Sequence, residues 1–172
     1  MKSATRRRLI NLPMLALGSH LLTACGFRLR GNQDYAFTSL YSGFAGNSTM
    51  GDEFRRTLEA SDKVKVIADN RQLDKAQVVL DVLTDQREKT VVGVSATGAV
   101  REFQLRLRFK FKLRTQGGKE LIPETEILQQ RDINFNESAV LSKEAEEGLL
   151  YRDMQSDIVQ QLLRRLGAVR AL

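Results

Sequence analysis

The sequence predicts an α+β fold, a two-layer sandwich in which two helices pack on one face of a mostly antiparallel sheet of four strands or slightly more. Three observations predict it. Within residues 101–114, apolar and polar side chains alternate strictly from Phe103 to Arg114, which is the period of a half-buried strand. Apolar residues recur about every four positions at 50–58 and 150–162, which indicates amphipathic helices. A length of 172 residues favours a single domain.

Short elements are predicted in the first half of this domain. Residues 35–44, with aromatic side chains spaced among Thr and Ser, are a first strand candidate. The apolar stripe at 50–58 predicts a short helix, and Ser48 or Thr49 can cap it. In residues 64–68, apolar side chains alternate with lysines, which predicts a short strand.

Long strands follow. Residues 76–94 are rich in Val and Leu and end in a glycine-containing turn. The alternating strand 101–114 comes next, and Gln116-Gly117-Gly118-Lys119 predicts a hairpin. Residues 120–136 return as a fourth long strand. Pro123 near its start indicates an edge position or a bulge, because proline cannot donate a hydrogen bond to a neighbouring strand.

A long helix closes the domain. Ser142 is predicted to cap it, and three glutamates fall in its first turn, where the helix dipole favours acidic groups. Two arginines and Gly167 are typical of its C-terminal end. The sequence therefore predicts one sandwich domain over 35–167 and a short C-terminal tail at 168–172.

The N-terminus is typical of an export signal. A basic stretch precedes an apolar segment that is too short to span a membrane comfortably. It ends in Leu22-Thr23-Ala24-Cys25, which resembles the lipobox of bacterial lipoproteins, and Cys25 is the only cysteine of the sequence. We therefore expect removal of residues 1–24 and a lipidated lead-in at 25–34. An ordinary signal peptide is the alternative, and the arginines at 6–8 leave a twin-arginine export route open.

Removal of the signal changes the charge and the chemistry. The net charge of +6 falls to +2, because four basic residues and no acidic ones are lost. His20, the only histidine, is lost as well, so the mature chain lacks the usual general base and zinc ligand. Asp81, Asp85 and Glu88 are a weak basis for a hydrolase. The sequence predicts no enzyme, no metal site and no cofactor.

The mature chain begins Cys25-Gly26-Phe27-Arg28-Leu29-Arg30-Gly31. This run, the residues around Tyr151 and the turn at Gly98 resemble the lipopolysaccharide-assembly lipoprotein family (LptE, formerly RlpB), the partner of the LptD barrel. The resemblance implies a lipid-anchored outer-membrane protein that plugs the lumen of that β-barrel from the periplasmic side, assists its assembly and binds lipopolysaccharide. Gly26 after the cysteine points, by the same resemblance, to the outer membrane. The alternative is a generic periplasmic lipoprotein adaptor for another envelope complex.

Basic side chains stand on the polar face of strand 101–114. Cations that could bind lipopolysaccharide phosphates there and at the two hairpins are Arg101, Arg106, Arg108, Lys110, Lys112, Arg114 and Lys119. The alternative is a solvated face, neutralised by acids on the flanking strands: Asp81, Glu88, Glu124 and Glu126. Because this face lacks interleaved aromatic residues, we predict no nucleic-acid binding. The strict alternation leaves no apolar surface evident for a further partner.

Overall fold

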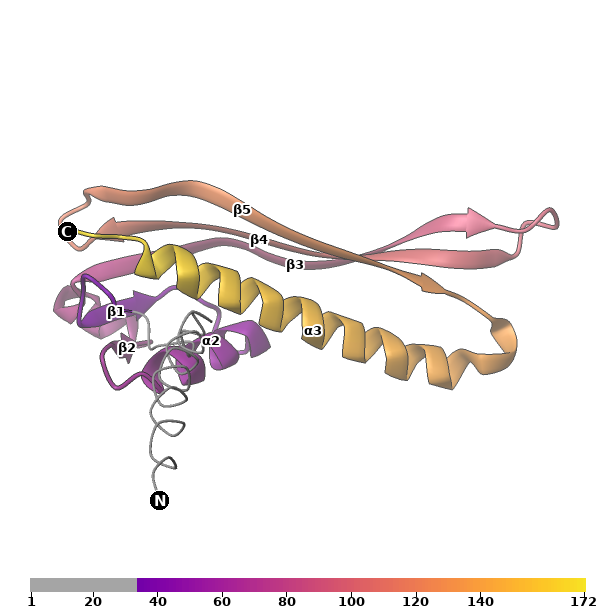
Figure 1. Cartoon of the computed structure of the whole chain (residues 1–172), viewed down its shortest axis with the longest axis horizontal. Helices are drawn as coiled ribbons and strands as arrows, with labels where there is room; N and C mark the ends of the chain where they lie inside the picture. The colour runs from indigo at the N-terminus through magenta and orange to yellow at the C-terminus, as the bar shows by residue number, and fades with distance from the viewer. Residues whose placement is uncertain (1–33) are drawn as a thin grey trace, which may run out of the picture. The chain divides into compact units, whose positions relative to one another are not determined.

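The computed structural model describes residues 34–172 (Figure 1). Cys25, the signal at 1–24 and all of the lead-in except Asp34 lie outside the described residues. In chain order, the strands, α-helices and 3₁₀ helices (η) are β1 (Ser39–Ser42), α2 (Thr49–Glu59), β2 (Lys65–Ile67), η2 (Asn70–Lys75), β3 (Val78–Val94), β4 (Val100–Thr115), β5 (Glu120–Asn134), η3 (Glu137–Ala139) and α3 (Val140–Gly167).

The predicted two-layer α+β sandwich is confirmed. Five strands form one sheet in the order β2-β1-β3-β4-β5, and α2 and α3 pack on it (Figure 1). The three long strands are antiparallel, whereas β1 runs parallel to both β2 and β3. Parallel neighbours need a crossover connection, and α2 supplies it between β1 and β2. No helix within residues 34–172 has the length and apolar character needed to cross a bilayer.

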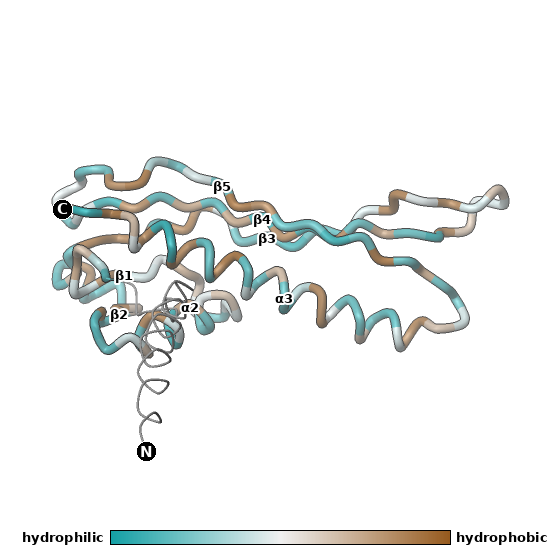
Figure 2. The backbone as a smooth tube through the Cα atoms, viewed as in Figure 1, coloured by the Kyte–Doolittle hydropathy of each residue, from teal (hydrophilic) through white to brown (hydrophobic). Residues whose placement is uncertain are grey.

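The core lies between the sheet and the helices. Odd-numbered apolar residues of β4 are fully buried, from Leu105 to Leu113, as the period of two predicts. Phe109 is central, since its ring stacks on those of Phe44 and Phe111 at centroid distances of 5.4 and 5.5 Å. The helices contribute their apolar stripes, and Figure 2 shows hydrophobic segments recurring along α3 between hydrophilic ones. The sheet is thus buried on one face only.

Apolar side chains are nevertheless exposed at one end of the domain, which corrects the expectation that no such surface remains. Val94 is 62% exposed, and Leu141 at the start of α3 is 82% exposed. Val94 is exposed because β3 and β4 continue to the pair Val94–Val100, beyond the last pair that β4 forms with β5, Glu102–Asn134. No element within residues 34–172 extends far enough to cover this hairpin (Figure 2).

The pairing of the long strands is interrupted by several register shifts, and two of them bear on the predictions. Pro123 lies at one of them, between the pairs Phe111–Thr125 and Leu113–Ile122, on edge strand β5. This confirms the prediction of an edge or bulge. The other shift lies in β3 between Val82 and Thr84 and was not predicted. It inverts which side chains of β3 face the helices.

The start of α3 differs from the prediction. The Asn136 side chain accepts a hydrogen bond from the Ser138 backbone N–H at 3.1 Å and caps η3, which continues directly into α3 at Val140. Ser142 therefore lies inside the helix and does not cap it. At α2, in contrast, Ser48 is the predicted cap: its Oγ accepts from the Gly51 N–H at 3.1 Å.

The different roles of Ser48 and Ser142 lead to a prediction about stability. Ser48→Ala removes the cap and also the 2.8 Å hydrogen bond from Ser48 Oγ to Asp85, so we expect a loss of about 1 kcal/mol of unfolding free energy. Ser142→Ala is the matched control, and we expect a change within about 0.5 kcal/mol, because alanine is favoured inside a helix. Chemical denaturation measures both. A larger loss for Ser142→Ala would contradict the assigned helix start.

Candidate functional site

The outer face of the sheet, away from the helices, brings the predicted basic row together. Even-numbered positions of β4 point outward because the odd-numbered ones are buried. The row consists of Arg106, Arg108, Lys110, Lys112 and Arg114. All five side chains are partly covered by their neighbours on β3 and β5, which lie on either side of β4.

Acids on the flanking strands pair with four of these five cations. Asp81 on β3 contacts Arg114, with an Oδ2–Nε distance of 2.8 Å, and also Lys112 at 3.9 Å. A single carboxylate thus serves two cations at this end of the row. Its bond to Arg114 is the tightest of the group, since a second guanidinium nitrogen reaches the other carboxylate oxygen at 3.4 Å.

The middle of the row is paired in the same way. Arg108 lies 3.0 Å from Glu126 and 3.5 Å from Glu88, so it is held between β5 and β3. Lys110 lies 3.4 Å from Glu126 and 3.9 Å from Glu124. All four acids that the sequence offered as neutralising partners are therefore in contact with the row. Much of its charge is balanced within the sheet.

Three of the predicted cations differ from the others. Arg106 donates from Nε to Gln104 Oε1 at 2.7 Å, and no carboxylate of residues 34–172 forms an ion pair with it. Arg101 and Lys119 are exposed and likewise have no ion pair within the described domain. They stand at opposite ends of β4, next to the β3–β4 and β4–β5 hairpins, separated by about 45 Å of strand (Figure 1). The structure does not bring these two into one site.

The sequence did not predict a second polar region, on the inner face of the sheet. After the register shift in β3, Arg87 and Lys89 lie on the face of the sheet that bears the helices, although both remain exposed. Lys89 Nζ lies 2.6 Å from Glu147 on α3 and 4.3 Å from the centre of the Phe103 ring. The available signal was the loss of alternation within 76–94, but a pattern alone does not show which residue is the extra one.

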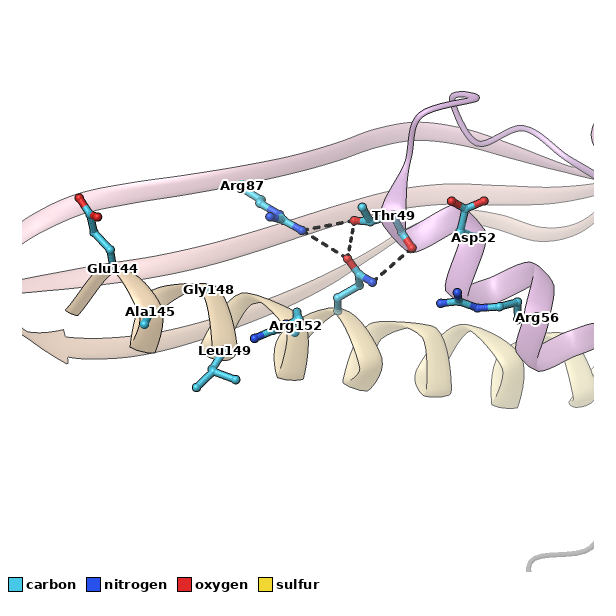
Figure 3. Close-up of a pocket in the computed structure, with 10 residues that line it drawn as sticks. Thr49, Asp52, Arg56, Arg87, Glu144, Ala145, Gly148, Leu149 and Arg152 are labelled. Carbon is cyan, nitrogen blue, oxygen red and sulfur yellow. Dashed lines mark hydrogen bonds between the residues drawn. The ribbon is translucent and has the colours of Figure 1, made fainter. Parts of the chain in front are cut away.

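Arg87 is the centre of this inner network. Its guanidinium donates to Thr49 Oγ1 at 3.4 Å and to Gln155 Oε1 at 3.3 Å (Figure 3). Its central carbon also lies over the Tyr151 ring, 5.2 Å from the ring centre. Gln155 is only 7% exposed and donates to Glu53 at 2.7 Å. The Tyr151 hydroxyl donates to the Glu88 carbonyl at 2.7 Å, and burial raises the pKa of Tyr151. The network ties α2, β3 and α3 together.

Comparison with known proteins identifies the family of this chain. The family model for LptE, described as lipopolysaccharide-assembly, matches residues 37–166, which is nearly all of the described domain. The chain belongs to the LptE family. The predicted family is thereby confirmed, on residues that lie after the Cys25–Gly31 run. LptE proteins are lipopolysaccharide-assembly lipoproteins of the cell envelope and not enzymes, so this chain is not an enzyme.

Individual relatives agree with this assignment. The LPS-assembly lipoprotein LptE of Pectobacterium atrosepticum is 27% identical over 164 residues, which are 94% of this chain and 86% of the relative. The solution NMR structure of lipoprotein B from Nitrosomonas europaea is 33% identical, with a TM-score of 0.70, over 83% of this chain and 91% of that one. Rare lipoprotein B from Shewanella oneidensis shares the fold, with a TM-score of 0.62 at 23% identity over 76% and 95% of the chains.

Proposed function

We propose that this LptE protein is anchored by Cys25 to the outer membrane, plugs the lumen of the lipopolysaccharide-translocating barrel LptD, assists its assembly and binds lipopolysaccharide. Membership of the family supports the general role. One structural observation supports the plug in particular: the outer face of the sheet bears charges of both signs, paired with each other across β3, β4 and β5.

A polar, internally neutralised face suits the lumen of a β-barrel. Such lumens are polar and hydrated, so a plug must present polar side chains and bury its apolar ones within itself. Apart from the exposed apolar end that includes Val94 and Leu141, the domain does so, because its sheet and helices bury the apolar face of β4 between them. The three long antiparallel strands β3, β4 and β5 also form a rigid surface, around which the barrel strands can assemble. This is the basis for the proposed role in barrel assembly.

Lipopolysaccharide carries phosphate groups, for which guanidinium forks are suited donors. All seven predicted cations remain candidates, but they are not equivalent. Arg108, Lys110, Lys112 and Arg114 already contact acids, so binding phosphate there requires breaking ion pairs. Arg101, Arg106 and Lys119 have no such partner within residues 34–172. We therefore propose that these three contribute most to lipopolysaccharide binding.

Affinity purification of the lipoprotein from outer membranes tests both parts of this proposal. We expect one barrel per chain to co-elute, and we expect binding of added lipopolysaccharide to weaken as salt rises, because screening reduces phosphate contacts. The double variant Arg101→Gln, Arg106→Gln should bind lipopolysaccharide about tenfold more weakly, corresponding to roughly 1.4 kcal/mol. The barrel should still co-elute with this variant.

The matched control is the double variant Lys112→Gln, Arg114→Gln, which also removes two charges but from residues paired with Asp81. We expect its affinity for lipopolysaccharide to change less than threefold. An equal loss in both variants would show that total charge, not unpaired cations, determines binding. Absence of the barrel from all eluates would contradict the plug.

A further inference from the structure

A second surface, distinct from the outer face, is a groove of about 690 Å³ along α3 (Figure 3). Its walls come from α2, from β3 and from residues 144–155 of α3. Arg56, Arg87 and Arg152, one from each of these elements, line it. They are far apart in the sequence, and only the fold gathers them.

The three arginines of this groove differ from the basic row on the outer face. No carboxylate of residues 34–172 forms an ion pair with Arg56, Arg87 or Arg152, although the groove also contains Asp52 and Glu144. Asp52 is instead paired with Arg55 at 2.8 Å. The groove therefore has three guanidinium groups that no carboxylate of the described domain neutralises, unlike the ion-paired cations of the outer face.

Arg87 is also held in place before any ligand binds. Thr49 and the buried Gln155 fix one end of its guanidinium group, and Tyr151 supports its plane. A guanidinium fork that is already oriented loses less conformational entropy on binding an oxyanion. This geometry favours a carboxylate or phosphate oxygen as the bound group.

The length and the charges of the groove favour the carboxylates of a peptide over a ligand with several phosphates. It follows α3 from Glu144 to Gln155, which is about 16 Å at 1.5 Å per residue and matches about five residues of extended peptide. Figure 3 shows Glu144 at one end and Arg56 at the other, with Arg152 between them. A carboxylate at one end disfavours a ligand with several phosphates, whereas a peptide can place its acidic residues opposite the arginines only.

The middle of the groove suits apolar side chains of such a peptide. Leu149 is 53% exposed on its wall. Gly148 beside it has open space where a side chain would otherwise stand. We propose that this groove binds an extended segment of a partner protein, about five residues long, in which acidic and apolar residues alternate.

A fluorescence-anisotropy titration tests this with the full-length lipoprotein in detergent and a labelled peptide, Ac-ELELE-NH2. We expect saturable binding that Arg87→Gln and Arg152→Gln each weaken at least fivefold. The peptide Ac-QLQLQ-NH2 should not bind. Arg108→Gln, on the outer face, is the control and should change the affinity less than twofold. Arg56→Gln and Arg152→Gln keep the test valid if Arg87→Gln fails to fold, because only Arg87 bonds to both Thr49 and Gln155.

Three results would overturn the proposal. One is absence of peptide binding at millimolar concentrations. Another is equal weakening by Arg108→Gln, which would indicate attraction to the overall charge of the protein. The last is competition by inorganic phosphate at the same concentration as unlabelled peptide, which would indicate a general anion site with no preference for an extended segment.

Discussion

Leu107→Asp is expected to lower the free energy of unfolding by about 4 kcal/mol or more. Leu107 is 1% exposed, in the middle of β4 and under the helices. An aspartate there must either bury a charge or take up a proton, and it also leaves the space of the leucine unfilled. Because domains are stable by only about 5–15 kcal/mol, this loss is a large fraction of the total stability and should lower the melting temperature markedly.

Gln130→Asp is the matched control for this substitution. It introduces the same side chain on the opposite face of the sheet, at an exposed position paired in register with Arg106. We expect a cost of no more than about 1 kcal/mol, mainly from the low strand propensity of aspartate. Thermal denaturation followed by circular dichroism measures both variants. Equal decreases in the melting temperature would show that the two faces of the sheet are wrongly assigned.

Cys25→Ala is expected to abolish membrane attachment without unfolding the protein. Each buried methylene of an acyl chain contributes about 0.8 kcal/mol to membrane affinity, so loss of the lipidated cysteine removes the main anchor. The buried core is built from residues 37–166, all well after this position. The variant should therefore appear in the soluble fraction, carry no radiolabelled palmitate and keep the melting temperature of the unlipidated domain.

Ala24→Ser is the control for the anchor, since it keeps a small residue before the cleavage site and should still be labelled. Palmitate labelling of Cys25→Ala, or its absence from the unsubstituted chain, would refute the lipoprotein assignment. A large fall in the melting temperature of Cys25→Ala would instead show that the lead-in is part of the core.

Much of the fold could be predicted from local pattern. Strand β4 was predictable because its alternation is unbroken from Phe103 to Arg114, and α2 because a four-residue repeat follows a good capping residue. The start of α3 was not, because Asn136 caps a 3₁₀ turn that leads into it. The register shift in β3 was not predictable either. One additional residue there reverses which face of the sheet each later side chain of the strand lies on.

The candidate sites also divide into one that could be predicted from the sequence and one that could not. The acids that pair with the basic row could be named from the sequence, because adjacent long strands place their outward residues side by side. The arginine groove could not. Arg56, Arg87 and Arg152 belong to three different elements, and each is an ordinary exposed arginine in its own local pattern. Only the packing of α2, β3 and α3 brings them together.

The central claim is that a barrel surrounds the domain, and photo-crosslinking from two opposite surfaces tests it most directly. A photoreactive amino acid is placed at Gln130, exposed on the outer face of the sheet, or at Asp153, exposed on α3. If the protein is a plug, both positions should crosslink to the same large outer-membrane barrel in living cells. Crosslinks from only one of the two surfaces would indicate an adaptor attached by a single face, and crosslinks from neither would contradict the account.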